Sequence, residues 1–259
     1  MGTPPTPHVL MTGATGTLGR ALVPRLTAAG LRVTGTASAD ADVRDADAVR
    51  RLVAAHAPDV VLHAAAFTDV AAAETDRATA WAVNVAGTRH VADAAREGGA
   101  RLLHVSSDYV FWGGDDRPEG GYRETDPPGP VRNAYALTKL VAEEAARRAP
   151  DALLLRTSFR PSVWPHPTAF TDLFTGQDYV DVIADLLTDV VRHHDEVEGD
   201  VLHVVTERKS VFDLVRRRTP DVAPGVRADA PVALPADVSL NTDRLAAHRG
   251  RWRAAEPAA

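Results

Sequence analysis

A tyrosine and a lysine four positions apart are the residues with the clearest chemical potential in this sequence. Tyr135 and Lys139 belong to the stretch NAYALTK, residues 133–139, and positions i and i+4 share one face of a helix. A free tyrosine has a pKa of ~10, which is too high for efficient proton exchange at neutral pH. A desolvated ammonium within about 4–6 Å stabilises the phenolate and lowers this pKa. The spacing therefore indicates a tyrosine acid beside a lysine; the alternative is two ordinary side chains on a solvated helix face.

A pair of serines could complete such a site. Ser106 and Ser107 end the apolar run RLLHVSS, residues 101–107. Hydroxyls at this position either satisfy the end of a strand or point into a cleft. In the second interpretation Ser107 hydrogen-bonds a carbonyl oxygen, Tyr135 protonates that oxygen, and a hydride reaches the carbon. Asn84, in VNVAGT, is predicted to lie on a helix near the cleft, where it could hold a water or Lys139.

A glycine-rich segment near the N-terminus predicts a dinucleotide site. The stretch TGATGTLGR, residues 12–20, follows an apolar run and opens a helical pattern. Its glycines, in G-x-x-G-x-x-G spacing, allow a tight turn and a close approach of backbone to pyrophosphate. The helix start adds free N–H groups and a positive dipole end. Glycines also end strands for structural reasons, but this position favours the nucleotide. The expected contacts are Gly13, Thr15, Gly16, Thr17, Leu18 and Gly19.

The end of the second apolar run helps to choose the cofactor. Thr36 and Ser38 stand where an acidic residue would hold a ribose 2′-hydroxyl. Hydroxyls do not repel a 2′-phosphate, and Arg20 lies near the loop, so NADP(H) is slightly preferred over NAD(H). The alternative for Arg20 is a solvated helix residue. Asp42 and Val43 follow at a position suited to the adenine.

Short apolar runs alternate with helical patterns along the chain. This alternation predicts an α/β fold, a doubly wound parallel sheet of Rossmann type covered on both faces. One long helix is expected over residues 74–97, with Trp81, Val85, Ala92 and Ala95 on one apolar face. The strand-like runs are residues 8–12, 31–36, 59–63, 101–107, 152–156 and 201–205, and a further helix is expected over residues 45–56.

Proline clusters and the loss of regular patterning suggest the domain organisation. Prolines gather at residues 118–130, 161–167 and 220–235, and the first two clusters should overhang the sheet edge where ligands bind. The expected parts are a disordered lead-in (1–7), a Rossmann domain that binds NAD(P) (8–156), a mixed segment (157–252) and a tail (253–259). The mixed segment would supply a small C-terminal substrate lobe together with a late strand and helix of the Rossmann core.

Composition excludes several classes of function. A net charge of −6 and a pI near 5.9 argue against nucleic acid as a main partner. The chain has no cysteines, so disulfides and thiolate metal sites are excluded, and no metal site is expected. No apolar run approaches the roughly 20 residues of a membrane span, and MGTPPTP lacks the features of a signal peptide. We therefore expect a cytoplasmic protein with no membrane partner.

In combination, these motifs resemble the extended short-chain dehydrogenase/reductases, most closely the dTDP-4-dehydrorhamnose reductase branch. The pieces that carry the resemblance are GATGTLG (13–19), PDVVLHAAAFTDV (58–70), VNVAGT (83–88), SSDYVF (106–111), YRETDPPGPVRNAYALTK (122–139), LLLRTS (153–158) and PADVSLNTDRL (235–245). The resemblance implies an NAD(P)H-dependent reductase of a 4-keto sugar on a nucleoside diphosphate. It implies that Ser107, Tyr135 and Lys139 are the catalytic triad. It implies that the dinucleotide is lined by Ala64, Ala65 and Ala66, and we expect the substrate to contact Thr68, Val70, Ser107, Asp108, Tyr109, Arg160 and Trp164.

The sequence also departs from that branch. Ser107 replaces the usual threonine, which keeps the hydroxyl, and Ala136 replaces a common glycine. After RTSF the chain runs through RPSVWPHPTAF, and the substrate lobe is expected to be trimmed. A replacement surface for a base or sugar could be formed by Arg160, Trp164, His166 and Phe170; the alternative is a packed proline-rich loop. Two alternatives therefore stay open: an epimerase or dehydratase with tightly bound NAD, and a non-catalytic nucleotide-binding regulatory subunit. A homodimer through helices that flank the sheet is the usual arrangement in this superfamily.

Overall fold

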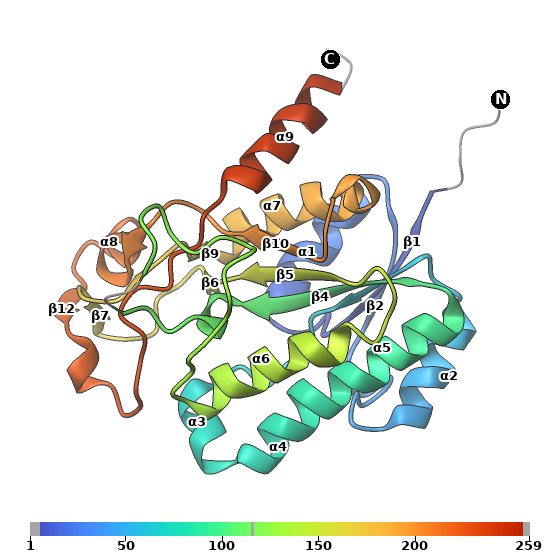
Figure 1. The fold of residues 1–259 in the computed structure, drawn as a ribbon, viewed down its shortest axis with the longest axis horizontal. Coiled ribbons are helices and arrows are strands. Elements are labelled where there is room, and N and C mark those ends of the chain that lie inside the picture. Colours follow the sequence, from blue (N-terminus) through green and yellow to red (C-terminus); the bar gives the residue numbers. More distant parts are fainter. Residues whose placement is uncertain (1–5, 115–116, 256–259) are drawn as a thin grey trace.

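A six-stranded parallel sheet forms the centre of the molecule. The computed structural model describes residues 6–114 and 117–255. The strand order is β10-β5-β4-β3-β1-β2, which confirms the predicted doubly wound α/β fold (Figure 1). Each predicted apolar run became a strand. The residues of the inner strands are nearly all buried between two helix layers, whereas the edge strand β2 is buried only at Thr36. The strands are β1 (His8–Thr12), β2 (Arg32–Thr36), β3 (Val60–His63), β4 (Arg101–Ser107), β5 (Leu153–Thr157) and β10 (Val201–Val204).

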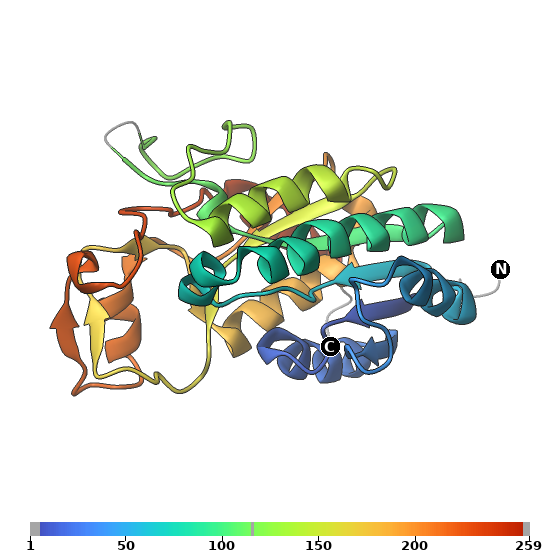
Figure 2. The same cartoon turned by 90° about the horizontal axis from the view of Figure 1, so that it is seen from below.

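Helices cover both faces of this sheet, as Figures 1 and 2 show. On one face lie α1 (Thr17–Ala28) and α7 (Val180–Arg192). Helix α9 (Asp243–Ala255) lies on the same side, and its Leu245 and Trp252 belong to the same core. On the other face lie α2 (Ala46–His56) and α5 (Gly87–Gly98), with α6 (Ala134–Ala146) beside them. Chain order reverses next to β1, so a crevice opens at the carboxyl ends of β1 and β3, where ligands bind in such folds.

The long helix expected over residues 74–97 is divided. The structure has α3 (Val70–Thr75), α4 (Arg77–Trp81), a π-helical turn (Ala82–Ala86) and then α5. Asp76 ends α3 and caps α4 by accepting the Thr79 N–H, and the wider π turn changes the angular position of later side chains. Val85, Ala92 and Ala95 are buried as expected, but the placement of Trp81 on the same face is wrong, because Trp81 is 45% exposed.

A small lobe stands at one end of the sheet (Figure 1) and has its own apolar core. That core includes Leu173, Val211 and Val215. The lobe consists of three two-stranded sheets, a short helix and connecting turns. The elements are β6 (Phe159–Arg160), β7 (Thr168–Phe170), β8 (Phe174–Thr175), β9 (Asp178–Tyr179), β11 (Lys209–Ser210), α8 (Val211–Arg216) and β12 (Ala223–Gly225). Residues 157–252 thus contain lobe elements together with β10, α7 and most of α9, elements that belong to the central layers.

The two ends of the chain are described in part. Helix α9 runs to Ala255 and so includes the first residues of the segment that the sequence assigns to a tail. Residues 1–5 of the expected lead-in and residues 256–259 of the expected tail lie outside the described residues. Within the described ranges, no helix combines the length and apolar character that crossing a membrane requires.

Candidate active site

A cleft of about 740 Å³ opens at the carboxyl ends of the central strands. It brings together the glycine loop after β1, the loop after β3, the end of β4, and the face of α6 that carries Tyr135 and Lys139. Most of the residues proposed from the sequence line it. They are Gly13, Thr15, Gly16, Thr17, Leu18, Thr36, Asp42, Val43, Ala64, Ala65, Ala66, Thr68, Val70, Ser107, Asp108, Tyr109, Tyr135, Lys139 and Arg160.

Three of the proposed residues are not among those that line the cleft. Gly19 packs against the loop, since a Cβ added there would lie 2.4 Å from the Ala14 Cα. Trp164 donates its indole N–H to the Thr168 carbonyl, and the Arg160 guanidinium lies 5.2 Å from its ring centroid. Asn84 is fully buried. None of these three residues lines the cleft. They shape it through the residues that they contact.

Asn84 connects the loop after β3 to α6. Its Oδ1 accepts the Phe67 backbone N–H at 2.7 Å, and its Nδ2 donates to Thr138 Oγ1 at 2.9 Å. Thr138 in turn donates to the carbonyl of Tyr135 at 2.8 Å. The expectation that Asn84 holds a water or Lys139 is replaced by this role: the amide fixes the loop lining the cleft relative to the helix of the tyrosine.

The glycine loop has the geometry of a phosphate cradle. Gly13 has φ +73°, and a Cβ there would lie 2.7 Å from the Ala65 nitrogen, so only glycine fits between the loops after β1 and β3. Gly16 is the N-cap of α1 and provides no side-chain acceptor. The first N–H groups of α1 therefore stay available to an anion, and the helix dipole favours one there.

The end of the cleft beyond β2, where the adenine is expected from the sequence, contains an arginine that sequence reasoning missed. Arg44 lines the cleft beside Ser38 and holds Asp42 in a bidentate pair, with Nη2 to Oδ2 at 2.6 Å and Nε to Oδ1 at 3.0 Å. These hydrogen bonds lower the pKa of Asp42. Arg20, the residue considered from the sequence, instead donates to the Thr15 carbonyl at 2.7 Å. The sequence feature that could have identified Arg44 is its position directly after Asp42 and Val43 in ADVRD, the stretch expected to contact the adenine.

Tyr135 and Lys139 are presented by the first turns of α6. Asn133 caps this helix by accepting the Ala136 N–H at 2.7 Å. The half-buried Tyr135 phenol hydrogen-bonds Ser107, and its ring packs edge-to-face on Tyr109 at 6.0 Å. Lys139 donates to the Val105 carbonyl at 2.8 Å. The structure thus places the three proposed catalytic residues at one point of the cleft.

Burial dominates the titration of both groups. It raises the pKa of Tyr135 to about 12, although the hydrogen bond to Ser107 opposes this. It lowers the pKa of Lys139 to about 8, while the charge of Glu143 acts in the opposite direction. The expected lowering of the Tyr135 pKa by Lys139 is absent from this structure: desolvation of the phenolate is the largest effect, and the side chains that modify it are Ser107 and Asp108.

A buried ion pair supports α6 from behind. Glu143 lies one turn beyond Lys139 and binds Arg156 of β5 through two contacts of 2.9 Å. Both side chains are almost fully buried, and Ser106 also donates to Glu143 at 2.6 Å. The pair fixes α6 to β4 and β5. Sequence reasoning missed it because its members come from separate elements.

The two histidines at the strand ends belong to the core. His63 contacts the hydroxyls of Thr12 and Thr88 at 2.7 and 3.1 Å, and burial lowers its pKa to about 3. His104 is likewise buried beside it. Neutral buried imidazoles of this kind are structural rather than acid–base groups. In the part of the chain that the structure describes, no cluster of three His, Cys, Asp or Glu residues could hold a metal ion.

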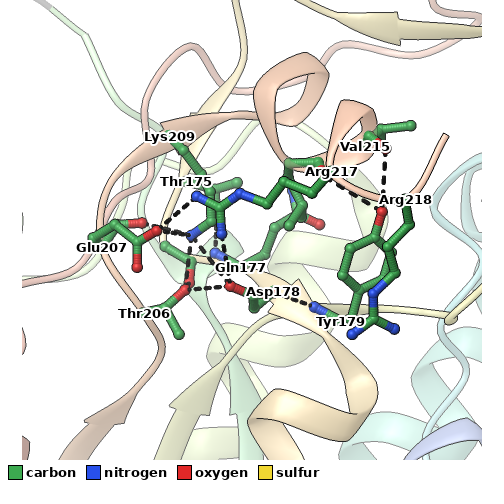
Figure 3. A network of polar contacts seen from close by, with 12 residues as sticks. Thr175, Gln177, Asp178, Tyr179, Thr206, Glu207, Lys209, Val215, Arg217 and Arg218 are labelled. Atoms are coloured by element: carbon green, nitrogen blue, oxygen red, sulfur yellow. Dashed lines mark hydrogen bonds and ion pairs between the residues drawn. The ribbon is translucent and has the colours of Figure 1, made fainter. Parts of the chain in front are cut away.

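The opposite wall of the cleft comes from the lobe. Arg160 donates to Gln177 Oε1 at 2.5 Å, and both residues line the cleft. Figure 3 shows the polar network next to Gln177, in which Asp178 accepts from Thr206 at 3.1 Å and faces Lys209 at 3.7 Å. These contacts, which link β9 to the β10–β11 connection, hold Arg160 and Gln177 in position.

The chain was compared with known families and proteins. The family model described as RmlD substrate binding domain matches residues 7–187. The dTDP-4-dehydrorhamnose reductase of Streptomyces griseus is 46% identical over 157 residues, which are 60% of this chain and 50% of that protein. The chain thus spans about half the length of the curated relatives it matches.

Solved structures show the same architecture. The dTDP-4-dehydrorhamnose reductase from Bacillus anthracis str. Ames, in complex with NADP, has a TM-score of 0.83 at 25% identity, covering 96% of this chain and 98% of that chain. A UDP-glucose 4-epimerase of Thermus thermophilus in complex with NAD has a TM-score of 0.74 at 20% identity, covering 97% and 95%. The second likeness establishes the fold alone.

Proposed function

Because this chain belongs to the family of the RmlD substrate binding domain, we propose that it catalyses the NAD(P)H-dependent reduction of a keto group on a nucleotide-activated sugar. The similar proteins from Streptomyces griseus and Bacillus anthracis are named dTDP-4-dehydrorhamnose reductases, which favours a 4-keto sugar on a nucleoside diphosphate as substrate. The observation that carries the proposal is the contact of Tyr135 with Ser107, on the helix face that also presents Lys139 to the cleft.

The cleft fits a dinucleotide on its own geometry. The close approach of the loops at Gly13 and Ala65, and the uncapped start of α1 at Gly16, form a cradle for two phosphates. Ala64, Ala65 and Ala66 present small side chains along the same wall. A nicotinamide dinucleotide bound here supplies the hydride.

The residues of this chain would donate the proton and hold the carbonyl group in position. Tyr135 holds the proton that the carbonyl oxygen needs as hydride reaches the carbon. Ser107 hydrogen-bonds the same oxygen, and Lys139 stabilises the phenolate left after proton transfer. Thr68, Val70, Asp108, Tyr109 and Arg160 surround this point and are assigned to the sugar nucleotide.

A slight preference for NADP(H) over NAD(H) is part of the proposal. The second strand ends in Thr36 without an acidic residue, and Ser38 and Arg44 line the cleft just beyond it. A guanidinium and a hydroxyl suit a 2′-phosphate, whereas a carboxylate at the end of β2 would repel it. Arg44 replaces Arg20 as the arginine in this assignment, and Asp42 with Val43 is assigned to the adenine.

Two other functions would use the same cleft. An epimerase or dehydratase would keep its NAD tightly bound, so it would purify with the cofactor, whereas a reductase exchanges it at each turnover. A regulatory subunit would have no need for Ser107, Tyr135 and Lys139 to meet in the cleft. That meeting favours the reductase.

The proposal extends to assembly and location. Trp81 and Leu137, each 45% exposed, lie on α4 and α6, and these helix faces suit a homodimer through the helices flanking the sheet. A cytoplasmic location, expected from the sequence, accompanies this proposal.

Steady-state kinetics test the function directly. Oxidation of NADPH and NADH is followed against a small panel of nucleotide-linked 4-keto sugars. The proposal expects turnover that depends on the sugar nucleotide, with a lower KM for NADPH than for NADH. Binding of the dinucleotide without turnover of any panel member would contradict the reductase and support a regulatory role.

A further inference from the structure

The Ser107 hydroxyl is hydrogen-bonded through both its oxygen and its proton. A serine hydroxyl has one proton to donate and two lone pairs that accept. Its oxygen accepts the Tyr109 backbone N–H at 3.1 Å, and the Tyr135 phenol is a further neighbour of the hydroxyl. Its one proton is directed to Asp108, whose Oδ1 lies 3.3 Å away. In this arrangement Ser107 has no proton left for the carbonyl oxygen of a substrate.

Asp108 is held in place from the lobe. The carboxyl lines the cleft and is 1% exposed. Its Oδ2 accepts from Thr175 Oγ1 at 2.7 Å. Thr175 Oγ1 itself accepts the Gln177 backbone N–H at 3.1 Å, which directs the Thr175 proton to Asp108. Ser158 adds a further hydrogen bond to the carboxyl. Thr175 and Gln177 begin the polar network of Figure 3.

The groups around Asp108 leave its charge weakly compensated. Arg160 is the cation whose charge reaches the carboxyl, but its guanidinium is bound to Gln177. The phenols of Tyr109 and Tyr135 are the other titratable groups that face it. Burial outweighs the hydrogen bonds and raises the pKa of Asp108 to about 6. Both protonation states are therefore accessible near neutral pH.

We propose that Asp108 is a positioning residue that controls the direction of the Ser107 proton. In its neutral form the acid lets Ser107 donate to the substrate, and in its ionised form it keeps that proton. This inference rests on the proposed function, since it assumes a carbonyl oxygen bound between Ser107 and Tyr135.

The reversal needs no change in covalent bonding. Ser107 has a second lone pair besides the one that accepts the Tyr109 N–H. The acid proton on Oδ1 of neutral Asp108 fills it, and the Ser107 proton then points at the carbonyl oxygen. Oδ2 goes on accepting from Thr175. An ionised Asp108 has no proton to offer, and its charge also repels the anionic diphosphate of the substrate.

The pH dependence of kcat/KM for keto-sugar reduction tests this from about pH 5 to about pH 9. For the unaltered protein, kcat/KM should fall about tenfold per pH unit above the apparent pKa of Asp108. Asp108→Asn keeps the shape, donates an amide N–H to Ser107 and cannot titrate. Its profile should lack this descending limb and fall only where Lys139, whose pKa is about 8, loses its proton, so its rate relative to the unaltered protein should rise with pH. An unchanged limb in Asp108→Asn would overturn the proposal.

Thr175→Val tests the same idea with the carboxyl intact. Thr175 stabilises the carboxylate, so its removal should move the descending limb to higher pH. Thr188→Val is the matched control, because Thr188 bonds only the Ala184 carbonyl within α7 among the contacts described for it; its limb should stay in place. If kcat/KM began to fall at the same pH in Thr175→Val and Thr188→Val, the role of the Thr175–Asp108 contact would be contradicted.

Infrared difference spectra separate this proposal from the proposed function. The spectrum of the resting protein minus that of Asp108→Asn follows the carboxylic acid of Asp108 without any turnover. The acid band should titrate near neutral pH and shift in Ser107→Ala. A carboxylate at every pH would overturn the inference even in an active reductase. Absence of turnover together with a titrating band would instead sink the reductase assignment.

Discussion

Two effects on the pKa compete at the Tyr135 hydroxyl. Burial raises the pKa and the Ser107 hydrogen bond lowers it, with burial the larger effect. Lys139, whose pKa burial lowers to about 8, lies one helical turn away with its ammonium on the Val105 carbonyl. Tyr135 is therefore protonated at neutral pH, which is the form that a proton donor to an alkoxide requires.

Cofactor choice is decided at Arg44 in this account. Arg44→Ala should weaken NADPH binding about tenfold or more, since a charge-assisted contact contributes roughly 1.5–3 kcal/mol, and should leave NADH binding nearly unchanged. Fluorescence titration with both dinucleotides measures the change. Arg20→Ala is the matched control and should alter neither affinity. If Arg20→Ala lowered NADPH affinity selectively while Arg44→Ala did not, the assignment of the 2′-phosphate to Arg44 would fail.

At the scale of elements, α6 is the part on which the site depends most. Its start is fixed by Asn133 and its far turns by the Glu143–Arg156 pair. Both ions of that pair are buried, so loss of one leaves the other uncompensated. These contacts fix α6 and with it the positions of Tyr135 and Lys139 in the cleft.

Glu143→Gln should therefore destabilise the protein by about 3–5 kcal/mol. The neighbouring Glu144→Gln removes an exposed pair with Arg147 and should cost about 0–1 kcal/mol. Urea unfolding of both variants gives the two values. A difference below about 1 kcal/mol between them would show that the buried pair does not anchor α6.

The sequence predicted elements and loops well where the signal is local. Every strand of the central sheet was expected, because continuous apolar runs such as β3 reflect burial on both faces. The glycine loop and the Tyr135–Lys139 spacing are also local patterns. The division of the helix over residues 74–97 depends on a π turn that no periodicity reveals, and Trp81 was misplaced for that reason.

Contacts between distant segments could not be predicted. Thr175 reaches Asp108, and Arg156 reaches Glu143, only because the lobe and the sheet bring them together. The sequence places Trp164 in the trimmed lobe, where it was expected to contact the substrate, but the chain turns its indole to the Thr168 carbonyl. Side-chain direction in a proline-rich loop is set by tertiary packing, which a single sequence does not record.

At the scale of the whole molecule, the dinucleotide should stabilise the fold by binding only the native state. At free NADPH of about 100 Kd the gain is about 2.7 kcal/mol, which appears as a higher melting temperature. Gly16→Trp places an indole where the phosphates are assigned and should abolish this rise. Thermal unfolding with and without NADPH measures it. An equal rise in Gly16→Trp would contradict the placement of the phosphates.

The lobe and the sheet act together in this account, since the cleft takes one wall from each. Tyr135→Phe tests the chemical step without disturbing this architecture, because it removes only the phenolic hydroxyl. Tyr179→Phe is the control: it removes a hydroxyl that bonds the Leu214 and Val215 carbonyls in the lobe. Both variants should bind NADPH with unchanged affinity.

Single-turnover reduction of a nucleotide-linked 4-keto sugar by these two variants tests the central claim most directly. We expect Tyr135→Phe to lose on the order of 10²–10⁴-fold in rate, and Tyr179→Phe to stay close to the unaltered protein. A Tyr135→Phe variant that reduces the sugar as fast as Tyr179→Phe would contradict the assignment of Tyr135 as the proton donor.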